Sequence, residues 1–550
     1  MEIELFQLPA GQPLAAAYSD RTDRNVINLF GGHPEEEESW RARAAALAAN
    51  ADSRVPAKAL ADTLRSYNAR FNDCPEVHKG IDAIGEGAPV IVGGQQAGLW
   101  TGPLLVIHKA VTVIQAARFA ARKLGTPVIP VFWIAGEDHD WDEVNHALVA
   151  THEQGIKKIA MDRPPGIRTS VSQTKLSKEA MNEAVTQLSV SLEDTEFKQD
   201  LIGHLATYAE SSETLTEWFA YLMGRLFGKY GLVLLDSDDP SIRRLEAPMF
   251  KRMIERNDEL EEAYTRGAAA VRELGYAEQA EVAPGGANLF LYHMEEGEQA
   301  GERTLLFKRS GRFKNRKGTL SMSREELLGI LEKTPERFSN NVLTRPLMQD
   351  YVLPVLGTVL GNGEIAYWSL TAEAFRTFGM QMPIIVPRMS FTLIEGAVAK
   401  HMAKYDLSFE DVIFRFEARK QAWLKERDEL SIEERFEEMK LKFAQLYDPL
   451  IEMAASVQAG LAELGVKNKR RIAEQIAYME TRTKDAHAQR FDAALRQLER
   501  ISLSLWPAGK PQERVFNLSV YWNRYGTEWI GDLLAIPYDP SGGHRLVYIN

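Results

Sequence analysis

Three short apolar runs stand out in the first half of the chain. They span 89–95, 128–135 and 231–235 and, apart from Gln95 at the end of the first, they are apolar without an alternation of apolar and polar positions. Runs of this kind are typical of parallel strands that are buried on both faces. Each run ends in glycine or acidic residues, which indicates that a loop follows it.

The segment between the first two runs has the pattern of an amphipathic helix. Apolar residues recur every three or four positions from Leu104 to Lys123, and Gly125 is a suitable helix end. Strand, helix and strand within this length predict a right-handed βαβ unit. We therefore predict an α/β fold with a Rossmann-like, doubly wound core. Ligands of such sheets bind beyond the carboxyl ends of the strands, which directs attention to the loops 93–102 and 136–146.

The polarity pattern also divides the chain into parts. We predict a core over 1–395 with two insertions, a helical one at about 151–230 and a β-rich one at 282–335 with glycine-containing turns. The tail, 506–550, mixes aromatic and turn residues and is expected to pack back on the core.

Residues 396–505 differ from the rest of the chain in composition and in the spacing of apolar residues. Charges are dense, proline and glycine are rare, and apolar residues recur at three and four. This narrow apolar seam predicts an antiparallel helical coiled coil that forms a homodimer. The alternative is that the stripe packs on the core as a helical layer.

Composition narrows the class of protein. The chain has 550 residues, a formal net charge of −12 and a single cysteine, Cys74. The acidic balance argues against nucleic acid or an anionic membrane as the main partner. The lone cysteine excludes an internal disulfide and favours a reducing compartment. No signal peptide or apolar stretch of spanning length is evident, so we expect a cytoplasmic protein.

The loop after the first strand has features of an anion site. Gly93 and Gly94 allow a close approach of the backbone to a ligand, and the helix that follows offers its amino terminus to phosphate or carboxylate. Gln95 and Gln96 would add amide donors and acceptors. The pattern is neither a Walker loop nor the dinucleotide fingerprint. The alternative is that the glycines only serve tight turns.

The loop after the second strand is rich in ionisable residues. Glu137, Asp138 and Asp140 could hold an ammonium group or orient a hydroxyl, and His139 could shuttle a proton near neutral pH. Together with His146 these residues could instead bind a divalent metal, but no recognised ligand spacing is present. A third interpretation is that the acids cap the next element.

Several longer motifs are spread along the chain. They are Gly94-Gln-Gln-Ala-Gly-Leu, Thr101-Gly-Pro-Leu, Ile107-His-Lys, Pro130-Val-Phe-Trp-Ile-Ala-Gly-Glu-Asp-His-Asp, Glu143-Val-Asn-His, Gly363-Glu-Ile-Ala-Tyr-Trp, Val386-Pro-Arg-Met-Ser-Phe-Thr and Pro511-Gln-Glu-Arg with Asn517 and Tyr525-Gly. Together they resemble a known family, the cysteine-adding enzymes of bacillithiol biosynthesis. The resemblance covers nearly the whole chain.

That resemblance implies a core similar to class I aminoacyl-tRNA synthetases, with connecting-peptide insertions and a coiled-coil dimerisation domain. It also implies an amide-forming reaction between the carboxylate of cysteine and the amine of glucosaminyl-malate, the last step of bacillithiol synthesis. The chain has neither His-Ile-Gly-His nor Lys-Met-Ser-Lys-Ser. Two routes for the activation of cysteine therefore remain open, one through an adenylate and one through an acyl phosphate.

The reaction assigns expected roles to the candidate residues. A carboxylate does not condense with an amine in water, so ATP with magnesium is expected, and His139 or a neighbouring carboxylate would act as general base. Arg345 or Arg388 would meet the malate. The full set is Asp138, His139 and Asp140 for catalysis, Gln95, Gln96, Glu137, Asn145, Glu364, Trp368, Arg345 and Arg388 for substrate, and Gly93, Gly94, Thr101, Gly102, His108 and Lys109 for nucleotide, with no metal ligand.

Two functions from other classes remain as alternatives. One is a nucleotide-binding accessory or assembly protein, in which the coiled coil carries the function. The other is a metal-dependent hydrolase that uses the loop at 136–146.

Overall fold

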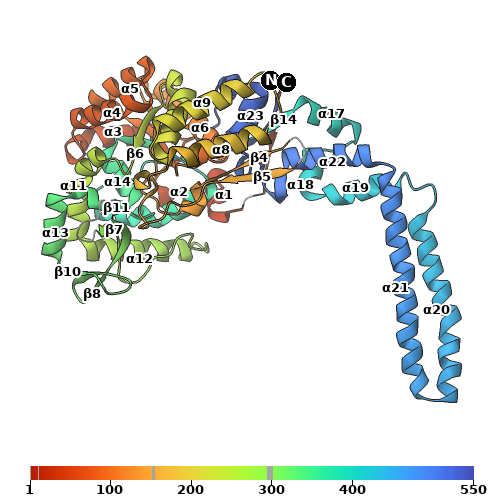
Figure 1. Ribbon diagram of the computed structural model, residues 1–550. Coiled ribbons are helices and arrows are strands. Elements are labelled where there is room, and N and C mark those ends of the chain that lie inside the picture. Colours follow the sequence, from red (N-terminus) through yellow and green to blue (C-terminus); the bar gives the residue numbers. More distant parts are fainter. Residues whose placement is uncertain (1, 10, 152–154, 294–300, 550) are drawn as a thin grey trace. The chain divides into compact units, whose positions relative to one another are not determined.

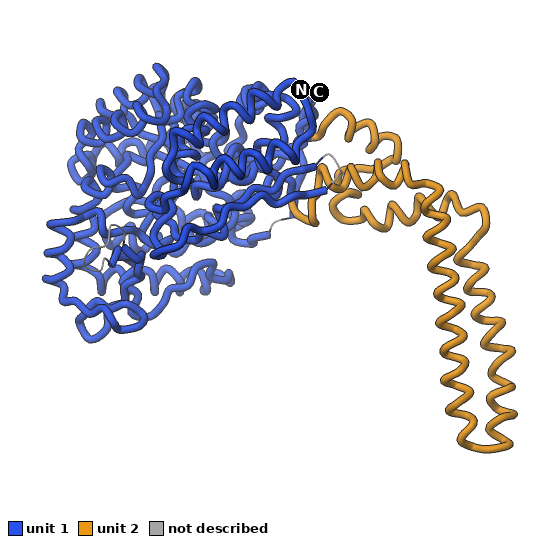
Figure 2. Tube along the Cα trace, viewed as in Figure 1, with its two compact units in different colours: residues 1–393, 511–549 blue, residues 394–510, 550 orange. Residues whose placement is uncertain are grey.

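A computed structural model describes residues 2–9, 11–151, 155–293 and 301–549. The chain forms two compact units, one of residues 1–393 with 511–549 and one of residues 394–510 (Figure 2). Residues 152–154 and 294–300 of the two predicted insertions lie outside the described residues.

A five-stranded parallel sheet forms the centre of the first unit, with the strand order β13-β12-β2-β3-β6. Its strands are β2 (Val90–Gln95), β3 (Ile129–Ile134), β6 (Val233–Asp236), β12 (Val355–Leu360) and β13 (Ile384–Pro387). The predicted α/β fold with a Rossmann-like parallel core is confirmed. Val92, Val131 and Val233 are fully buried, as continuous apolar runs require. The sequence did not predict β12.

Helices cover this sheet. The predicted crossover helix is α6 (Leu105–Leu124), which joins β2 to β3, packs against both and also contacts β12. Helices α4 (Ala57–Phe71) and α5 (Pro75–Gly85) pack against β6 and β3. The other helices of this part are α1 (Pro13–Ser19), α2 (Arg24–Phe30), α3 (Glu37–Ala49), α11 (Pro240–Glu255), α12 (Asn257–Glu273), α14 (Arg345–Val352), α15 (Asn362–Trp368) and α16 (Ala372–Thr377).

The first insertion is mostly helical. It contains α8 (Lys178–Ser191), α9 (Lys198–Ser211) and α10 (Leu215–Phe227). The range 151–230 also holds a strand, because β5 (Ile156–Ala160) pairs antiparallel with β4 (His146–Ala150). The helical description of this range is therefore incomplete.

The second insertion is a five-stranded antiparallel sheet of order β10-β9-β8-β7-β11. Its strands are β7 (Gly286–His293), β8 (Glu302–Arg309), β9 (Arg312–Asn315), β10 (Ser321–Met322) and β11 (Phe338–Asn340). Helix α13 (Arg324–Lys333) lies between β10 and β11, so the range 282–335 is not entirely β-structure.

The C-terminal segment, residues 511–549, belongs to the first unit. Its helices are α23 (Leu518–Tyr525) and α24 (Glu528–Ala535), and its strand β15 (His544–Ile549) pairs antiparallel with β1 (Glu2–Phe6). Strand β14 (Ser390–Glu395), which begins in this unit, follows β15 in the same sheet.

The second unit is helical. Helices α20 (Ile432–Val457) and α21 (Gly460–Gln489) form a long antiparallel hairpin (Figure 1), with ion pairs such as Lys440–Glu480 between them. The remaining helices are α17 (Gly396–Lys404), α18 (Phe409–Phe414), α19 (Phe416–Lys425) and α22 (Asp492–Leu505), and α22 contacts the other three. Within the described ranges, no helix combines the length and the apolar character needed to cross a bilayer.

Candidate active site

A cavity of about 800 Å³ opens at the carboxyl ends of the parallel strands, within the first unit. The loops after β2, β3, β12 and β13 supply one side of it, and β7 and β8 of the second insertion supply residues on another. Strand connections run in opposite directions from β2 and β12, which are neighbours in the sheet. The cavity therefore occupies the switch point at which α/β sheets bind ligands.

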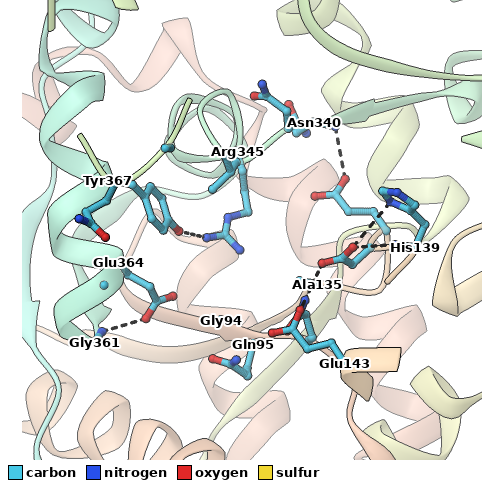
Figure 3. A pocket seen from close by; sticks show the side chains of 18 of the residues that line it. Gly94, Gln95, Ala135, His139, Glu143, Asn340, Arg345, Gly361, Glu364 and Tyr367 are labelled. Carbon is cyan, nitrogen blue, oxygen red and sulfur yellow. Dashed lines mark hydrogen bonds and ion pairs between the residues drawn. The ribbon is translucent and has the colours of Figure 1, made fainter. Parts of the chain in front are cut away.

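Ten of the residues singled out in the sequence line this cavity. They are Gly94, Gln95, Gln96, Lys109, Glu137, Asp138, His139, Arg345, Glu364 and Arg388. Figure 3 shows Arg345 pointing into the cavity, between Glu364 and the loop that carries His139. Seven others are not among the lining residues, namely Gly93, Thr101, Gly102, His108, Asp140, Asn145 and Trp368.

The two glycines at the end of β2 serve packing. A Cβ on Gly93 would lie 2.5 Å from Cγ2 of Val113, and a Cβ on Gly94 would lie 2.8 Å from the carbonyl oxygen of Trp133. Neither contact is sterically possible, so both positions require glycine whatever the ligand is.

Thr101 and Gly102 lie in a strained turn that the C-terminal segment covers. Thr101 has a φ of 76°, in the left-handed region that non-glycine residues rarely adopt. The side-chain amide of Asn517 holds the turn by donating to the carbonyl of Gly102 at 2.7 Å and to two other carbonyls. The amide of Leu104 donates to the carbonyl of Phe516. Because this segment occupies the start of α6, the turn is not arranged as an open phosphate site.

His108 contacts the buried ion pair of Arg388 and Glu513. Its Nδ1 lies 2.6 Å from a carboxylate oxygen of Glu513, and the same carboxylate accepts two hydrogen bonds from Arg388 at 2.6 and 2.7 Å. Burial raises the pKa of Glu513, but Arg388 and His108 outweigh it and hold that pKa well below its usual range. Burial lowers the pKa of His108. Glu513 thus fixes Arg388 at the cavity wall.

Lys109 is also fully paired. Its ammonium group donates to Glu364 at 2.6 Å, to the carbonyl of Gly94 and to the side chain of Gln95. Burial raises the pKa of Glu364, but Lys109 and Arg345 outweigh it and lower that pKa, so Glu364 is a carboxylate at neutral pH. This pair links the ends of β2 and β12 across the switch point.

Asp138 is held as a carboxylate by hydrogen bonds. Gln96 donates to it at 2.6 Å, and the amides of His139 and Asp140 donate to its other oxygen. Burial raises the pKa of Asp138, but these hydrogen bonds outweigh it and lower the pKa. Gln96 also donates to Glu143, which brings that carboxylate to the same wall.

Glu137, in the loop after β3, is held in place by a buried arginine. Arg243 of α11 is completely buried and pairs with Glu137, with Asp238 at 3.2 Å and with Glu246 at 2.6 Å. Burial raises the pKa of Glu246 to about 8, so Glu246 carries a proton at neutral pH. Three carboxyl groups therefore share one guanidinium, and the proton on Glu246 reduces the negative charge around it.

Three other predicted residues have local roles. The Asn145 side chain donates to the carbonyl of Met161, Trp368 is a core side chain that is 1% exposed, and Asp140 precedes the short helix α7 (Trp141–Val144). Among the described residues, no three His, Cys, Asp or Glu side chains come together as a metal site would require.

Sequence reasoning missed several residues of the site. Tyr367, Glu143 and Arg303 line the cavity, while Arg243 and Glu513 support it. Glu143, Tyr367 and Glu513 fall within motifs already noted, which was a usable signal. Nothing in the local sequence distinguishes Arg243 or Arg303 from other arginines.

Comparison with known proteins gives full-length matches. A family model described as the N-terminal Rossmann-like domain of bacillithiol biosynthesis BshC matches residues 1–389, and a model of the C-terminal coiled-coil domain of BshC matches residues 391–549. A protein of Geobacillus thermodenitrificans is 37% identical over all of both chains, and one of Geobacillus sp. (strain WCH70) is 36% identical over all of both chains. Each bears the name "Putative cysteine ligase BshC".

A solved structure is also similar in part. It is titled as a putative arginyl-tRNA synthetase from Campylobacter jejuni, is 9% identical and covers 78% of this chain and 93% of its own. The TM-score is 0.21, so this similarity carries no argument about fold or function.

Proposed function

Because this chain belongs to the BshC family of bacillithiol biosynthesis proteins, we propose that it is a ligase that joins the carboxylate of cysteine to the amine of glucosaminyl-malate. The product of that amide bond is bacillithiol. The two relatives that match over their full length bear the name "Putative cysteine ligase BshC". The same activity is proposed for this chain.

One observation carries this proposal, namely that a single cavity is lined both by Arg345 and by the carboxylates Asp138 and Glu143. Arg345 donates to the neutral phenol of Tyr367, whereas Arg388 already donates twice to Glu513. Arg345 is therefore the better candidate for a malate carboxylate. Asp138 and Glu143 lie at the wall of the loop after β3 and suit an amine.

Two of the six residues proposed for nucleotide support a nucleotide in the same cavity. Of the residues proposed for nucleotide, Gly94 and Lys109 line the cavity, and Lys109 brings a cation beside the backbone of β2. ATP, with magnesium bound to its phosphates, would supply the leaving group that a free carboxylate lacks.

The bond changes are those of acyl transfer. The neutral amine attacks the activated carbonyl carbon of cysteine, the new C–N bond forms, and the bond from that carbon to the phosphate oxygen breaks. The amine gives up one proton, for which His139 or a neighbouring carboxylate is available. The carbonyl oxygen becomes negatively charged during the attack and needs a hydrogen-bond donor.

The test is reconstitution with the full-length chain. Purified protein is incubated with cysteine, glucosaminyl-malate, ATP and magnesium, and the amide product is followed by mass spectrometry together with AMP or ADP. AMP with pyrophosphate indicates an adenylate, and ADP with phosphate indicates an acyl phosphate. Arg345→Gln should raise the KM for glucosaminyl-malate, whereas Arg309→Gln, on the surface of β8, should not. An equal KM in both variants would contradict the malate assignment.

A further inference from the structure

Arg303 reaches the candidate site from the inserted antiparallel sheet. It lies on β8, yet its guanidinium contacts the loop that follows β3 of the parallel sheet. The Nη1 atom of Arg303 is 3.0 Å from Nδ1 of His139, and both side chains line the cavity.

The guanidinium of Arg303 is fixed by its other contacts. Its Nε donates to the hydroxyl of Ser339 at 2.9 Å, and its Nη2 donates to the carbonyl of Asn340 at 2.7 Å. The guanidinium carbon lies 3.8 Å from the centre of the Phe290 ring. All three nitrogens have partners, so the side chain cannot turn away from His139 without losing several favourable contacts.

This contact favours one of the two neutral tautomers of His139. Arginine stays protonated at every pH at which proteins are folded, and its nitrogens only donate hydrogen bonds. Nδ1 of His139 must therefore accept. A neutral imidazole that accepts at Nδ1 carries its proton on Nε2, so that Nε2 is a donor.

We infer that Arg303 is a positioning residue that holds His139 as the neutral Nε2–H tautomer, so that His139 serves as a hydrogen-bond donor and not as the general base. This inference rests on the proposed ligase reaction for the identity of the acceptor. In that reaction the Nε2–H group would donate to the carbonyl oxygen of the activated cysteine, which becomes negative as the amine attacks.

The proton of the amine then passes to a carboxylate. Asp138 already accepts three hydrogen bonds, which favour its ionised form and make it a weak base. Glu143 accepts from Gln96 and lines the same wall. Glu143 is therefore the residue to which this inference assigns the proton.

The charges around His139 agree with a neutral ring. Arg303 faces it from β8 and Arg163 donates to its backbone carbonyl at 3.4 Å. Asp138 and Asp140 lie in its own loop, and Oδ1 of Asp138 is 3.7 Å from Nδ1, farther than the 3.0 Å to Arg303. Burial lowers the pKa of His139 and Arg303 lowers it further, whereas the two aspartates raise it. The net effect is a pKa below the usual value, which leaves the imidazole neutral at pH 7.

Nitrogen NMR of the full-length protein with ¹⁵N-labelled histidine tests the tautomer directly. The resonances of His139 are those that disappear in His139→Gln. Between pH 6 and 8 we expect a protonated Nε2 and an unprotonated Nδ1. In Arg303→Met the Nδ1–H form or a charged ring should become populated, whereas Arg309→Gln, on the same strand and stacked on Phe307, should match the wild type. The other histidine signals report whether Arg303→Met is folded. Protonation of Nδ1 in the wild type at pH 7 would overturn the inference.

Activity separates a donor from a base. The side-chain amide of glutamine can donate close to the position of Nε2, but it cannot accept a proton. We therefore expect His139→Gln to keep the rate within about tenfold and His139→Ala to lose on the order of 10²–10³, as when one oxyanion donor is removed. Equal losses would show that His139 is the base. If the wild type makes no amide product while NMR gives the expected tautomer, the ligase proposal fails and the role of Arg303 stands.

Discussion

Replacing Glu246 by glutamine tests the charge balance around Arg243, the buried residue that pairs with Glu137 in the loop after β3. Arg243 is the buried cation that Glu137, Asp238 and Glu246 share, and Glu246 is itself completely buried. Burial raises the pKa of Glu246 from 4.5 to about 8. Glutamine has the shape of the protonated acid but cannot ionise, so the variant should fold normally near neutral pH.

The expected effect on stability depends on pH. Because the pKa of Glu246 is higher in the folded state, the folded state binds the proton more tightly than the unfolded chain does. This contribution to the free energy of unfolding is fully present below pH 4.5 and is lost as the pH rises to about 8. At about 1.4 kcal/mol per pKa unit, the loss is on the order of 5 kcal/mol. Glu246→Gln avoids it, so its advantage over the wild type should grow by up to that amount between pH 5 and pH 9.

Urea unfolding followed by tryptophan fluorescence at pH 5, 7 and 9 measures this difference. Glu255→Gln, at the exposed end of the same helix, is the matched control and should follow the wild type. Asp236→Asn provides a second test, because burial and Asp238 raise the pKa of Asp236 to about 8 as well. Parallel pH profiles for Glu246→Gln and the wild type would refute the reasoning.

Three further predictions concern the site and the coiled coil. Glu513→Gln leaves Arg388 buried without its anion and should lower the free energy of unfolding by about 3–5 kcal/mol near neutral pH, with the exposed Glu528→Gln as control in the same urea titration. Because the pKa of Glu513 is depressed, this difference should shrink as the pH falls below 4.5. Asp138→Asn or His139→Ala should strongly lower the bacillithiol level of cells at normal protein abundance, and a normal level would remove these residues from the mechanism. Deleting the hairpin 432–489, whose Leu446 and Val457 are more than 70% exposed, should convert a dimer into a monomer by light scattering, and an intact protein that is already monomeric would contradict this.

The parallel core was predictable because each strand is encoded locally. The apolar runs at 89–95, 128–135 and 231–235 coincide with β2, β3 and β6, since strands buried on both faces must be apolar throughout. The run that becomes β12 is harder to recognise. It follows Pro354 and is interrupted by Gly357 and Thr358, so a single sequence does not distinguish it from the end of the preceding helix.

The position of the site could be predicted from the rule that ligands bind at the carboxyl ends of parallel strands. The hydrogen bonds and ion pairs that hold its residues could not. Loops at the carboxyl ends of β2 and β3 line the cavity because parallel strands bring those ends to one edge. The partners that fix the loops come from distant parts of the chain. Glu513 is 405 positions from His108, and Arg303 is 164 positions from His139, and no local pattern encodes such pairs. The same reason explains Thr101 and Gly102, whose turn is covered by a segment more than 400 positions away.

The thiol pool of cells that lack this chain tests the ligase assignment most directly. In a deletion strain, glucosaminyl-malate should accumulate and bacillithiol should disappear, because the final amide bond cannot form, and the wild-type chain should reverse both changes. Bacillithiol can be measured by mass spectrometry after thiol labelling, and glucosaminyl-malate, which has no thiol, by mass spectrometry directly. A bacillithiol level in the deletion strain equal to that of the parent would contradict the proposed function.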